Sequence, residues 1–217
     1  AGVDGTPSRL VSGNFAAGRS TVMFREAVAY YHIDNSQRYL QSLGYIGEAG
    51  LQNVNMKVDV EGAQGKKNAY YWGTANRIEV GYSKCNSVAS DRDIHYAEAS
   101  GVLIHEYVHA LQKAMLPDFS GGDTDAIGEG FSDYWALSHR YRSDDEGARK
   151  VLPNEPFPWS CLSRPADKVG VQYEEGRNYG AHESLGVGSA KSDQLWSTPL
   201  FQSYLELRKL GVSQEDI

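Results

Sequence analysis

The stretch His105-Glu106-Tyr107-Val108-His109 constrains this chain more than any other part of its sequence. Residues 97–115 are predicted to form one helix, and Pro117 stops it just beyond that range. Positions i and i+4 lie about 40° apart around a helix, so both imidazoles face the same way. Two neutral imidazoles at this spacing can bind one Zn²⁺ without any bend in the backbone. The stretch therefore predicts a metal-binding helix.

A zinc hydrolase needs a third protein ligand and a fourth position open to water, and a second predicted helix offers that ligand. Glu129 lies there, within the sequence GEGFSDYWA. Asp133 follows one turn later on the same face, where its carboxylate can accept a hydrogen bond from a ligand imidazole. Glu106 is placed to act as a general base toward a water at the metal without ligating the ion. The alternative interpretation is two amphipathic helices that share an incidental charged face.

The N-terminal half contains one long predicted helix followed by short strands. Residues 21–43 contain neither proline nor glycine, and Gly44 is placed to end the helix. Apolar residues alternate with polar ones over residues 53–60, which is the period of a half-buried strand. Residues 68–72 and 77–82 are predicted as two further strands around a Gly-Thr turn. Because the turns between the strands are short, we expect an antiparallel meander and not a parallel sheet.

The C-terminal half is predicted to be mainly helical. Residues 125–140 and 194–210 have helical patterns, and Pro199 is expected at a start or a kink of the second helix. Residues 153–178 hold four of the seven prolines of the chain and are predicted to be irregular.

The order of helix, strands and then helices indicates an α+β fold. We expect an N-terminal lobe, residues 1–116, with a mostly antiparallel sheet and the helix that carries both histidines. A mainly helical lobe, residues 117–217, then supplies Glu129. The two lobes are expected to form one catalytic domain with a cleft between them.

Composition excludes several classes of protein. The 217 residues include 21 Lys+Arg and 28 Asp+Glu, which gives a formal net charge of −7. No apolar stretch approaches the roughly 20 residues that a transmembrane helix needs, so we expect no membrane span. We also expect no nucleic-acid partner, because Lys66-Lys67 is the only dense basic pair. A hydrophobic share of 41% is enough for a buried core and argues against a disordered chain.

These motifs resemble those of the gluzincin metallopeptidases, specifically the thermolysin and fungalysin families. In thermolysin-like enzymes the glutamate ligand follows the second histidine after as many residues as here, whereas gluzincin aminopeptidases typically have one fewer. The letters GEGFSDYWA resemble the fungalysin family, so the chain combines features of both families or is a distinct relative. The resemblance implies a zincin-like fold, one catalytic Zn²⁺ held by His105, His109 and Glu129, and cleavage within extended polypeptides by an endopeptidase.

The resemblance implies two further sites. Asn68-Ala69 matches the Asn-Ala of the edge strand along which the substrate backbone lies in these families. An exposed strand edge offers unpaired N–H and C=O groups, so an extended peptide can add to it as a further strand. An ordinary edge strand is the alternative. The segment Tyr179-Gly180-Ala181-His182 resembles the one whose histidine stabilises the oxyanion of the tetrahedral intermediate, which assigns that role to His182.

Departures from thermolysin leave other functions open. Ser120 stands where thermolysin has a tyrosine that assists the oxyanion, and Arg177 replaces an aspartate near the oxyanion histidine. These departures keep open a zinc-containing binding or adhesion module that has lost catalysis. A gluzincin aminopeptidase is the other alternative, although no anchor for a free amino terminus is apparent. Gly101 and Arg140 stand at positions of thermolysin's paired calcium site, so calcium is not predicted there, and a calcium site elsewhere stays open.

The remaining expectations concern the setting of the chain. Its start, AGVDGTPSRL, lacks a basic-then-apolar signal, so we expect a secreted, mature protein from which any signal peptide and propeptide have been removed. Cys85 and Cys161 can form one disulfide or remain two free thiols. The substrate is expected to be a peptide or protein, and the chain is expected to be a monomer. A length of 217 residues is small for this superfamily, which indicates either a minimal catalytic unit or a fragment.

Overall fold

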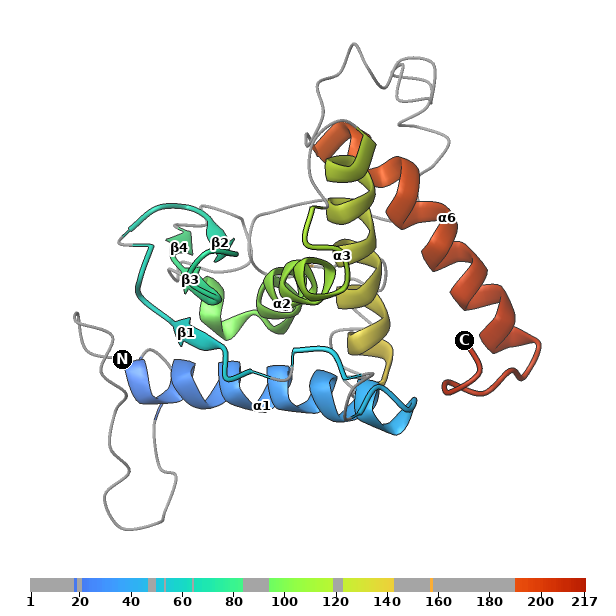
Figure 1. Cartoon of the computed structure of the whole chain (residues 1–217), viewed down its shortest axis with the longest axis horizontal. Coiled ribbons are helices and arrows are strands. Elements are labelled where there is room, and N and C mark those ends of the chain that lie inside the picture. The colour runs from blue at the N-terminus through green and yellow to red at the C-terminus, as the bar shows by residue number, and fades with distance from the viewer. Residues whose placement is uncertain are drawn as a thin grey trace.

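Helix α2 (Ser100–Met115) lies at the centre of the molecule, with the other long helices around it (Figure 1). Its first three turns are almost entirely buried, and Leu103, Ile104 and Val108 are fully enclosed. Burial of each such aliphatic side chain contributes about 1.5–3 kcal/mol to stability. Only the end of the helix, from Lys113 onward, is exposed. The helix that carries both histidines is therefore an element of the hydrophobic core.

The computed structural model describes most of the chain. The described residues are 18, 21–46, 50–52, 54–63, 65–83, 94–118, 123–142, 157 and 190–217. None of the helices within these ranges is long and apolar enough to cross a bilayer. The predicted irregular segment 153–178 lies outside them, apart from Phe157.

Helix α1 (Val22–Ser42) agrees with the helix predicted over residues 21–43. The Thr21 hydroxyl caps it by accepting a hydrogen bond from the Phe24 N–H at 3.2 Å. Beyond its other end Gly44 adopts a φ of +97°, the left-handed conformation that favours glycine and ends helices. Helix α1 crosses next to α2, and its residues Ala29 and Leu40 are buried in the same hydrophobic cluster as the apolar residues of α2.

Three short strands form a sheet in the order β1-β3-β2. They are β1 (Lys57–Asp59), β2 (Ala69–Trp72) and β3 (Arg77–Val80). β2 and β3 pair in antiparallel fashion, as expected. β1 pairs with β3 in parallel, with Val58 opposite Ile78. The prediction of an antiparallel meander is therefore wrong for β1, which pairs in parallel with β3 and not with β2.

The segment between β1 and β2 explains the parallel pairing. The last described residues before β2 lie at the end of β3, where the Gly81 N–H donates to the Asn68 carbonyl at 3.0 Å and the Tyr82 N–H donates to the Lys66 carbonyl at 3.2 Å. A Cβ on Gly81 would lie 2.0 Å from the carbonyl oxygen of Lys66, so glycine is required at this close approach. Crossing to the far side of β3 takes about 10 Å, two strand spacings, and a segment of this length reaches much further. The sequence pattern predicted a simple turn here and did not reveal the crossing.

A two-stranded antiparallel pair and a short helix lead from the sheet into α2. The pair consists of β4 (Tyr82–Ser83) and β5 (Ile94–His95), and the 3₁₀ helix η2 (Tyr96–Glu98) follows it directly. The helix predicted from residue 97 begins at Ser100, because Ala99 has an extended backbone that separates α2 from η2.

Helix α3 (Asp123–Arg142) extends beyond its predicted range at both ends, and α6 (Ala190–Lys209) begins before its predicted range and ends one residue before it does. α3 packs against α2 on one side and against α6 on the other (Figure 1). Gly130 permits the contact with α6, because a Cβ there would lie 2.4 Å from the Asp193 carbonyl oxygen and 2.6 Å from the Trp196 Cβ. Pro199 lies inside α6.

Two hydrophobic clusters meet on α3. Ala136 belongs to the cluster formed by α1, α2 and the sheet, whereas Leu137 packs with Phe201 and Tyr204 of α6. One helix therefore serves both parts of the core. The lobe boundary after residue 116 and the zincin-like fold class stay predictions.

Candidate metal centre

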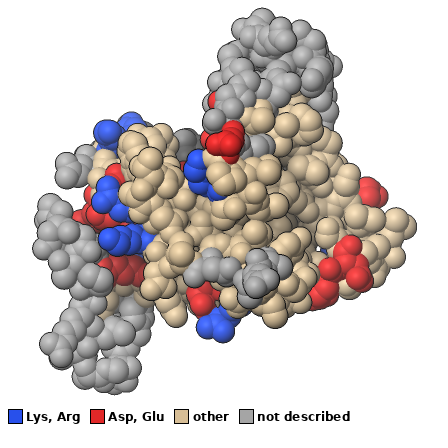
Figure 2. Space-filling view, in the orientation of Figure 1, with Lys and Arg blue, Asp and Glu red and all other residues tan. Residues whose placement is uncertain are grey.

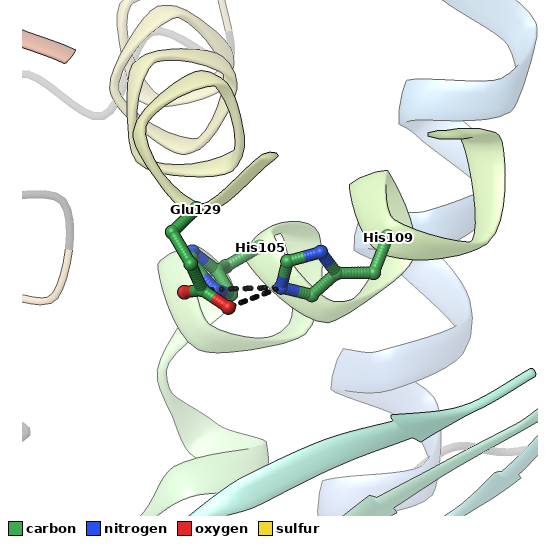
Figure 3. A group of neighbouring side chains, drawn as sticks. All are labelled: His105, His109 and Glu129. Atoms are coloured by element: carbon green, nitrogen blue, oxygen red, sulfur yellow. Dashed lines mark hydrogen bonds and ion pairs between the residues drawn. The ribbon is translucent and has the colours of Figure 1, made fainter. Parts of the chain in front are cut away.

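Three side chains from two helices converge on one point: His105 and His109 from α2, and Glu129 from α3 (Figure 3). The two histidine Nε2 atoms are 3.1 Å apart. The Glu129 carboxylate directs one oxygen to each imidazole, 3.0 Å from His105 Nε2 and 3.2 Å from His109 Nε2. One ligand atom from each residue lies within 4.8 Å of the others. The structure thus brings together the three residues that were predicted as metal ligands.

The packing of two helices produces this convergence. His105 and His109 share one face of α2 because they are one turn apart. Glu129 lies in the second turn of α3, where α3 packs against α2. All three side chains are therefore held on helices, which position a site more firmly than loops do.

A buried carboxylate orients the first ligand. His105 Nδ1 lies 2.8 Å from Asp133 Oδ1, and the two side chains are 5% and 0% exposed. The Nδ1–H donates to the carboxylate, so Nε2, which faces Glu129 and His109, is the nitrogen of His105 that is placed to ligate a metal ion. The Phe157 ring stands edge-on to the His105 ring at 5.4 Å. The hydrogen bond predicted for Asp133 is present.

The electrostatics of the site favour a positive charge at His105. Burial alone would lower the pKa of His105, but hydrogen bonds to Asp133 and Glu129 raise it to about 10. Burial alone would raise the pKa of Glu129, but hydrogen bonds from both imidazoles hold it well below its usual range. A metal ion needs a neutral imidazole, so metal binding replaces the proton on His105 with a larger positive charge.

The donor set and its spacing fit a zinc ion. A tetrahedral Zn²⁺ with ligand distances of about 2.1 Å keeps its ligand atoms about 3.4 Å apart. The observed separations of 3.0, 3.1 and 3.2 Å are slightly shorter, so a small outward movement accommodates the ion. Two imidazoles and one carboxylate leave a fourth position, which catalytic zinc sites keep for water or substrate.

Gln112 orients the second ligand and was not predicted. Its Oε1 lies 3.1 Å from His109 Nδ1, and its Nε2 donates to the Gly128 carbonyl at 2.9 Å. The spacing of three residues after His109 on one helix is the signal that could have indicated the first contact. The second contact depends on the position of α3, which the sequence does not show.

Glu106, the predicted general base, follows His105 on α2 and is 8% exposed. Among the described residues the converging ligand atoms come from His105, His109 and Glu129 and not from Glu106, in agreement with a role other than ligation. Glu106 lies three residues before His109, a spacing at which helical side chains are neighbours. The structure therefore places it in the same turn as the ligands.

Asn68 and Ala69 lie at the start of β2, an edge strand of the three-stranded sheet. Asn68 is exposed and Ala69 is buried. β2 packs against α2, and Gly73, just after the strand, lies beside the side chain of Lys113 on α2. The strand predicted to bind substrate thus runs next to the helix that bears both histidines.

Several predicted positions lie outside the described residues. They are His182 with its neighbour Tyr179, Ser120, Arg177, and the two cysteines Cys85 and Cys161. The two calcium-site positions are described: Gly101 is buried in α2 and Arg140 is buried in α3. Neither offers a carboxylate, so no calcium ion is assigned there.

Two fungal proteins are similar to this chain. Each carries the name "Probable extracellular metalloproteinase 2", one from Arthroderma benhamiae and the other from Trichophyton verrucosum. The identity is 23% over 175 residues, which covers 71% of this chain and 23% of each relative. The chain thus spans about a quarter of the length of the curated relatives it matches. No family model and no solved structure matches the chain.

Proposed function

We propose that this chain is the catalytic part of a zinc-dependent endopeptidase that hydrolyses peptide bonds in extended polypeptides. The convergence of His105, His109 and Glu129 carries the proposal, with Asp133 behind the first histidine. Two imidazoles and one carboxylate are a known ligand set of catalytic zinc sites. The similarity to fungal proteins named as extracellular metalloproteinases supports a metalloprotease kind of function.

The residues of the chain then have distinct roles. A zinc ion at these ligands supplies Lewis acidity, which lowers the pKa of a water and polarises the scissile carbonyl. Glu106 takes the proton of the attacking water and delivers it to the leaving nitrogen. Asp133 holds His105 in the tautomer whose Nε2 is free to ligate. The near-complete burial of Glu106 limits competing water around its carboxylate.

Two assignments concern the substrate and the oxyanion. The substrate backbone pairs with β2 near Asn68 and Ala69 and extends the sheet by one strand. The edge position of β2 and its contact with α2 support this assignment. His182 donates a hydrogen bond to the oxyanion that forms during attack. The resemblance to the thermolysin and fungalysin families is the basis of the role of His182.

The proposed partner is a peptide or protein, and the proposed setting is extracellular. Both similar fungal proteins are named as extracellular. Figure 2 shows basic side chains lying among acidic ones on the face it presents, with no extended basic patch among the described residues there. Nucleic-acid binding depends on clustered Lys and Arg, so this surface favours a different partner. We propose that the chain acts as a monomer.

The substitution Glu106→Gln tests the proposal. It preserves the size of the side chain and removes its ability to accept the proton of water. We expect the variant to keep bound zinc, measured by atomic absorption, and to hydrolyse fluorescent casein at least about 100-fold more slowly. Glu206→Gln is the matched control, because Glu206 lies exposed on α6 and pairs with Lys209. Undiminished hydrolysis by the Glu106→Gln variant would contradict the role of Glu106.

Peptides with free and acetylated amino termini separate the alternatives. Equal cleavage of both forms at an internal bond supports an endopeptidase. Cleavage that requires the free amine supports an aminopeptidase. Bound zinc without cleavage of any peptide in a broad library supports a binding module that has lost catalysis.

A further inference from the structure

We propose that Gln112 is a positioning residue that selects the ligating tautomer of His109 and joins this ligand to the helix that carries Glu129. The inference rests on the proposed metal site and concerns how that site is held. Gln112 touches His109 on its own helix and Gly128 on α3, the residue directly before Glu129. It therefore lies between the second and the third ligand.

The Gly128 carbonyl determines the orientation of the Gln112 amide. A carbonyl oxygen only accepts hydrogen bonds, so the amide group 2.9 Å away must be the NH₂. The Ser132 hydroxyl donates to the same carbonyl at 2.8 Å, and its Oγ lies 3.5 Å from Gln112 Nε2. The amide oxygen is consequently the atom that faces His109.

This orientation determines which nitrogen of His109 carries the proton. The amide oxygen accepts only, and it lies 3.1 Å from His109 Nδ1, so the hydrogen belongs on Nδ1. His109 Nε2, which faces His105 Nε2 and Glu129 Oε1, is then the nitrogen that can ligate a metal ion in place of its hydrogen bond to Glu129. The opposite tautomer would set two acceptors against each other and direct an N–H at the metal position. Gln112 thus favours the form of His109 that can ligate.

Gln112 and Asp133 together hold α3 against α2 on both sides of Glu129. Gln112 contacts α3 at Gly128, one residue before Glu129. Asp133 contacts α2 through His105, one turn after Glu129. The carboxylate bond to His105 is charge-assisted and the amide bond to His109 is neutral, so we expect the Gln112 contact to be the weaker of the two. Loss of Gln112 should therefore loosen the site without dismantling it.

The substitution Gln112→Leu tests this role, because it removes both contacts with little change in volume. We expect the zinc affinity, measured by competition with a chromophoric chelator, to fall about 10–100-fold, as for other outer partners of metal ligands. We also expect the His109 Nδ1–H signal in ¹⁵N NMR spectra of the zinc-saturated protein to lose its protection from exchange. Gln112→Glu keeps an acceptor toward His109 and should restore that protection, although it cannot donate to Gly128.

Gln37→Leu is the matched control. Gln37 lies on α1, donates to the Leu51 carbonyl at 3.0 Å and accepts a hydrogen bond from the Tyr107 hydroxyl, so it contacts α2 without touching a ligand. The zinc affinity of the Gln37→Leu variant should equal that of the wild type. Wild-type zinc affinity in Gln112→Leu, or equal loss of protection in the Leu and Glu variants, overturns the role of Gln112 and leaves the metal site intact. A wild-type protein that binds no zinc overturns the proposed function itself.

Discussion

Two pairs of histidines in this molecule have the same distance between their ring nitrogens but opposite electrostatic surroundings. His105 and His109 bring their Nε2 atoms within 3.1 Å on α2. His32 on α1 and His139 on α3 bring Nδ1 and Nε2 within 3.1 Å as well. The sequence spacing of the first pair is local, whereas the second pair forms only because α1 and α3 lie together.

The surrounding charges decide what each pair can do. Burial opposes a charge on His105, but its two carboxylate partners raise its pKa to about 10. Burial, together with the charges of Arg142 and His32, lowers the pKa of His139 to about 3. The first pair therefore attracts a cation, whereas His139 of the second pair stays neutral in neutral solution. The distance between two imidazoles does not predict a metal site unless the neighbouring charge is known.

The second pair belongs to the packing between α1 and α3. The His32 and His139 rings meet edge to face at 5.4 Å. Arg142 lies over the Tyr39 ring at 3.9 Å and near the Trp135 ring at 4.9 Å, as a cation–π contact. We interpret this group as a structural contact that excludes cations from His139.

The largest expected effect concerns the carboxylate that distinguishes the first pair. Glu129→Gln removes the charge of a direct ligand, so the zinc affinity should fall by more than about 100-fold. That value is the upper end of the loss seen when a residue that only hydrogen-bonds to a metal ligand is replaced. A chelator competition titration measures this loss. His139→Phe is the comparison, and it should leave zinc affinity unchanged. Equal losses in both variants would contradict the distinction between the pairs.

The second prediction concerns acid stability. The unfolded chain has an ordinary histidine pKa near 6.5, and the folded pKa of His139 is about 3, so the unfolded state takes up the proton first as pH falls. The stabilising contribution is complete above about pH 6.5 and is lost between about pH 6.5 and pH 3. At pH 5 the loss amounts to about 2 kcal/mol.

Urea unfolding of the zinc-saturated protein at pH 7.5 and pH 5 measures this loss. His139→Phe cannot titrate, so its stability should fall less than that of the wild type, by about 2 kcal/mol. The contributions of other groups are common to both proteins and cancel in the difference. The same fall in both proteins would show that His139 is not the group that titrates.

The smallest expected effect concerns the cation beside the second pair. Arg142→Met removes the guanidinium and keeps an apolar side chain, so stability at pH 7.5 should fall by about 1 kcal/mol through the lost cation–π contacts. The pKa of His139 should rise toward its ordinary value, because Arg142 is one cause of its lowering. The loss of stability between pH 7.5 and pH 5 should then shrink.

Arg208→Met is the matched control for this prediction. Arg208 is exposed on α6 and donates to the Val212 carbonyl at 3.0 Å, away from both histidine pairs. It should leave the acid response unchanged. An Arg142 variant with the acid response of the wild type would remove Arg142 from the explanation of the second pair.

The ligands could be predicted from the sequence because helical periodicity is local. The spacing of His105 and His109, and of Glu129 and Asp133, places each pair on one helix face whatever the rest of the chain does. The parallel pairing of β1 could not be predicted, because it depends on which strand of the sheet β1 lies beside once the chain has folded. Local patterns predict strands well and their partners poorly.

Gln112 was missed for a related reason. Its distance from His109 along α2 is visible in the sequence, but a glutamine at such a spacing is ordinary on a helix surface. The contact that makes it significant runs to the Gly128 carbonyl of α3. Backbone acceptors have no sequence signature, so a hydrogen bond to one becomes visible only when the helices are placed.

The sequence by itself determined that two imidazoles share one face of α2 and that two carboxylates share one face of α3, since helix geometry follows from the backbone. Only the tertiary structure decided that these faces meet, because the position of α3 depends on its packing against both α2 and α6. The packing of α1 against α3 likewise brings His32 to His139, whereas Arg142 lies near His139 because it is three residues later on the same helix. Spacing along the chain selects which side chains lie together on a helix, and long-range packing selects which charges they meet.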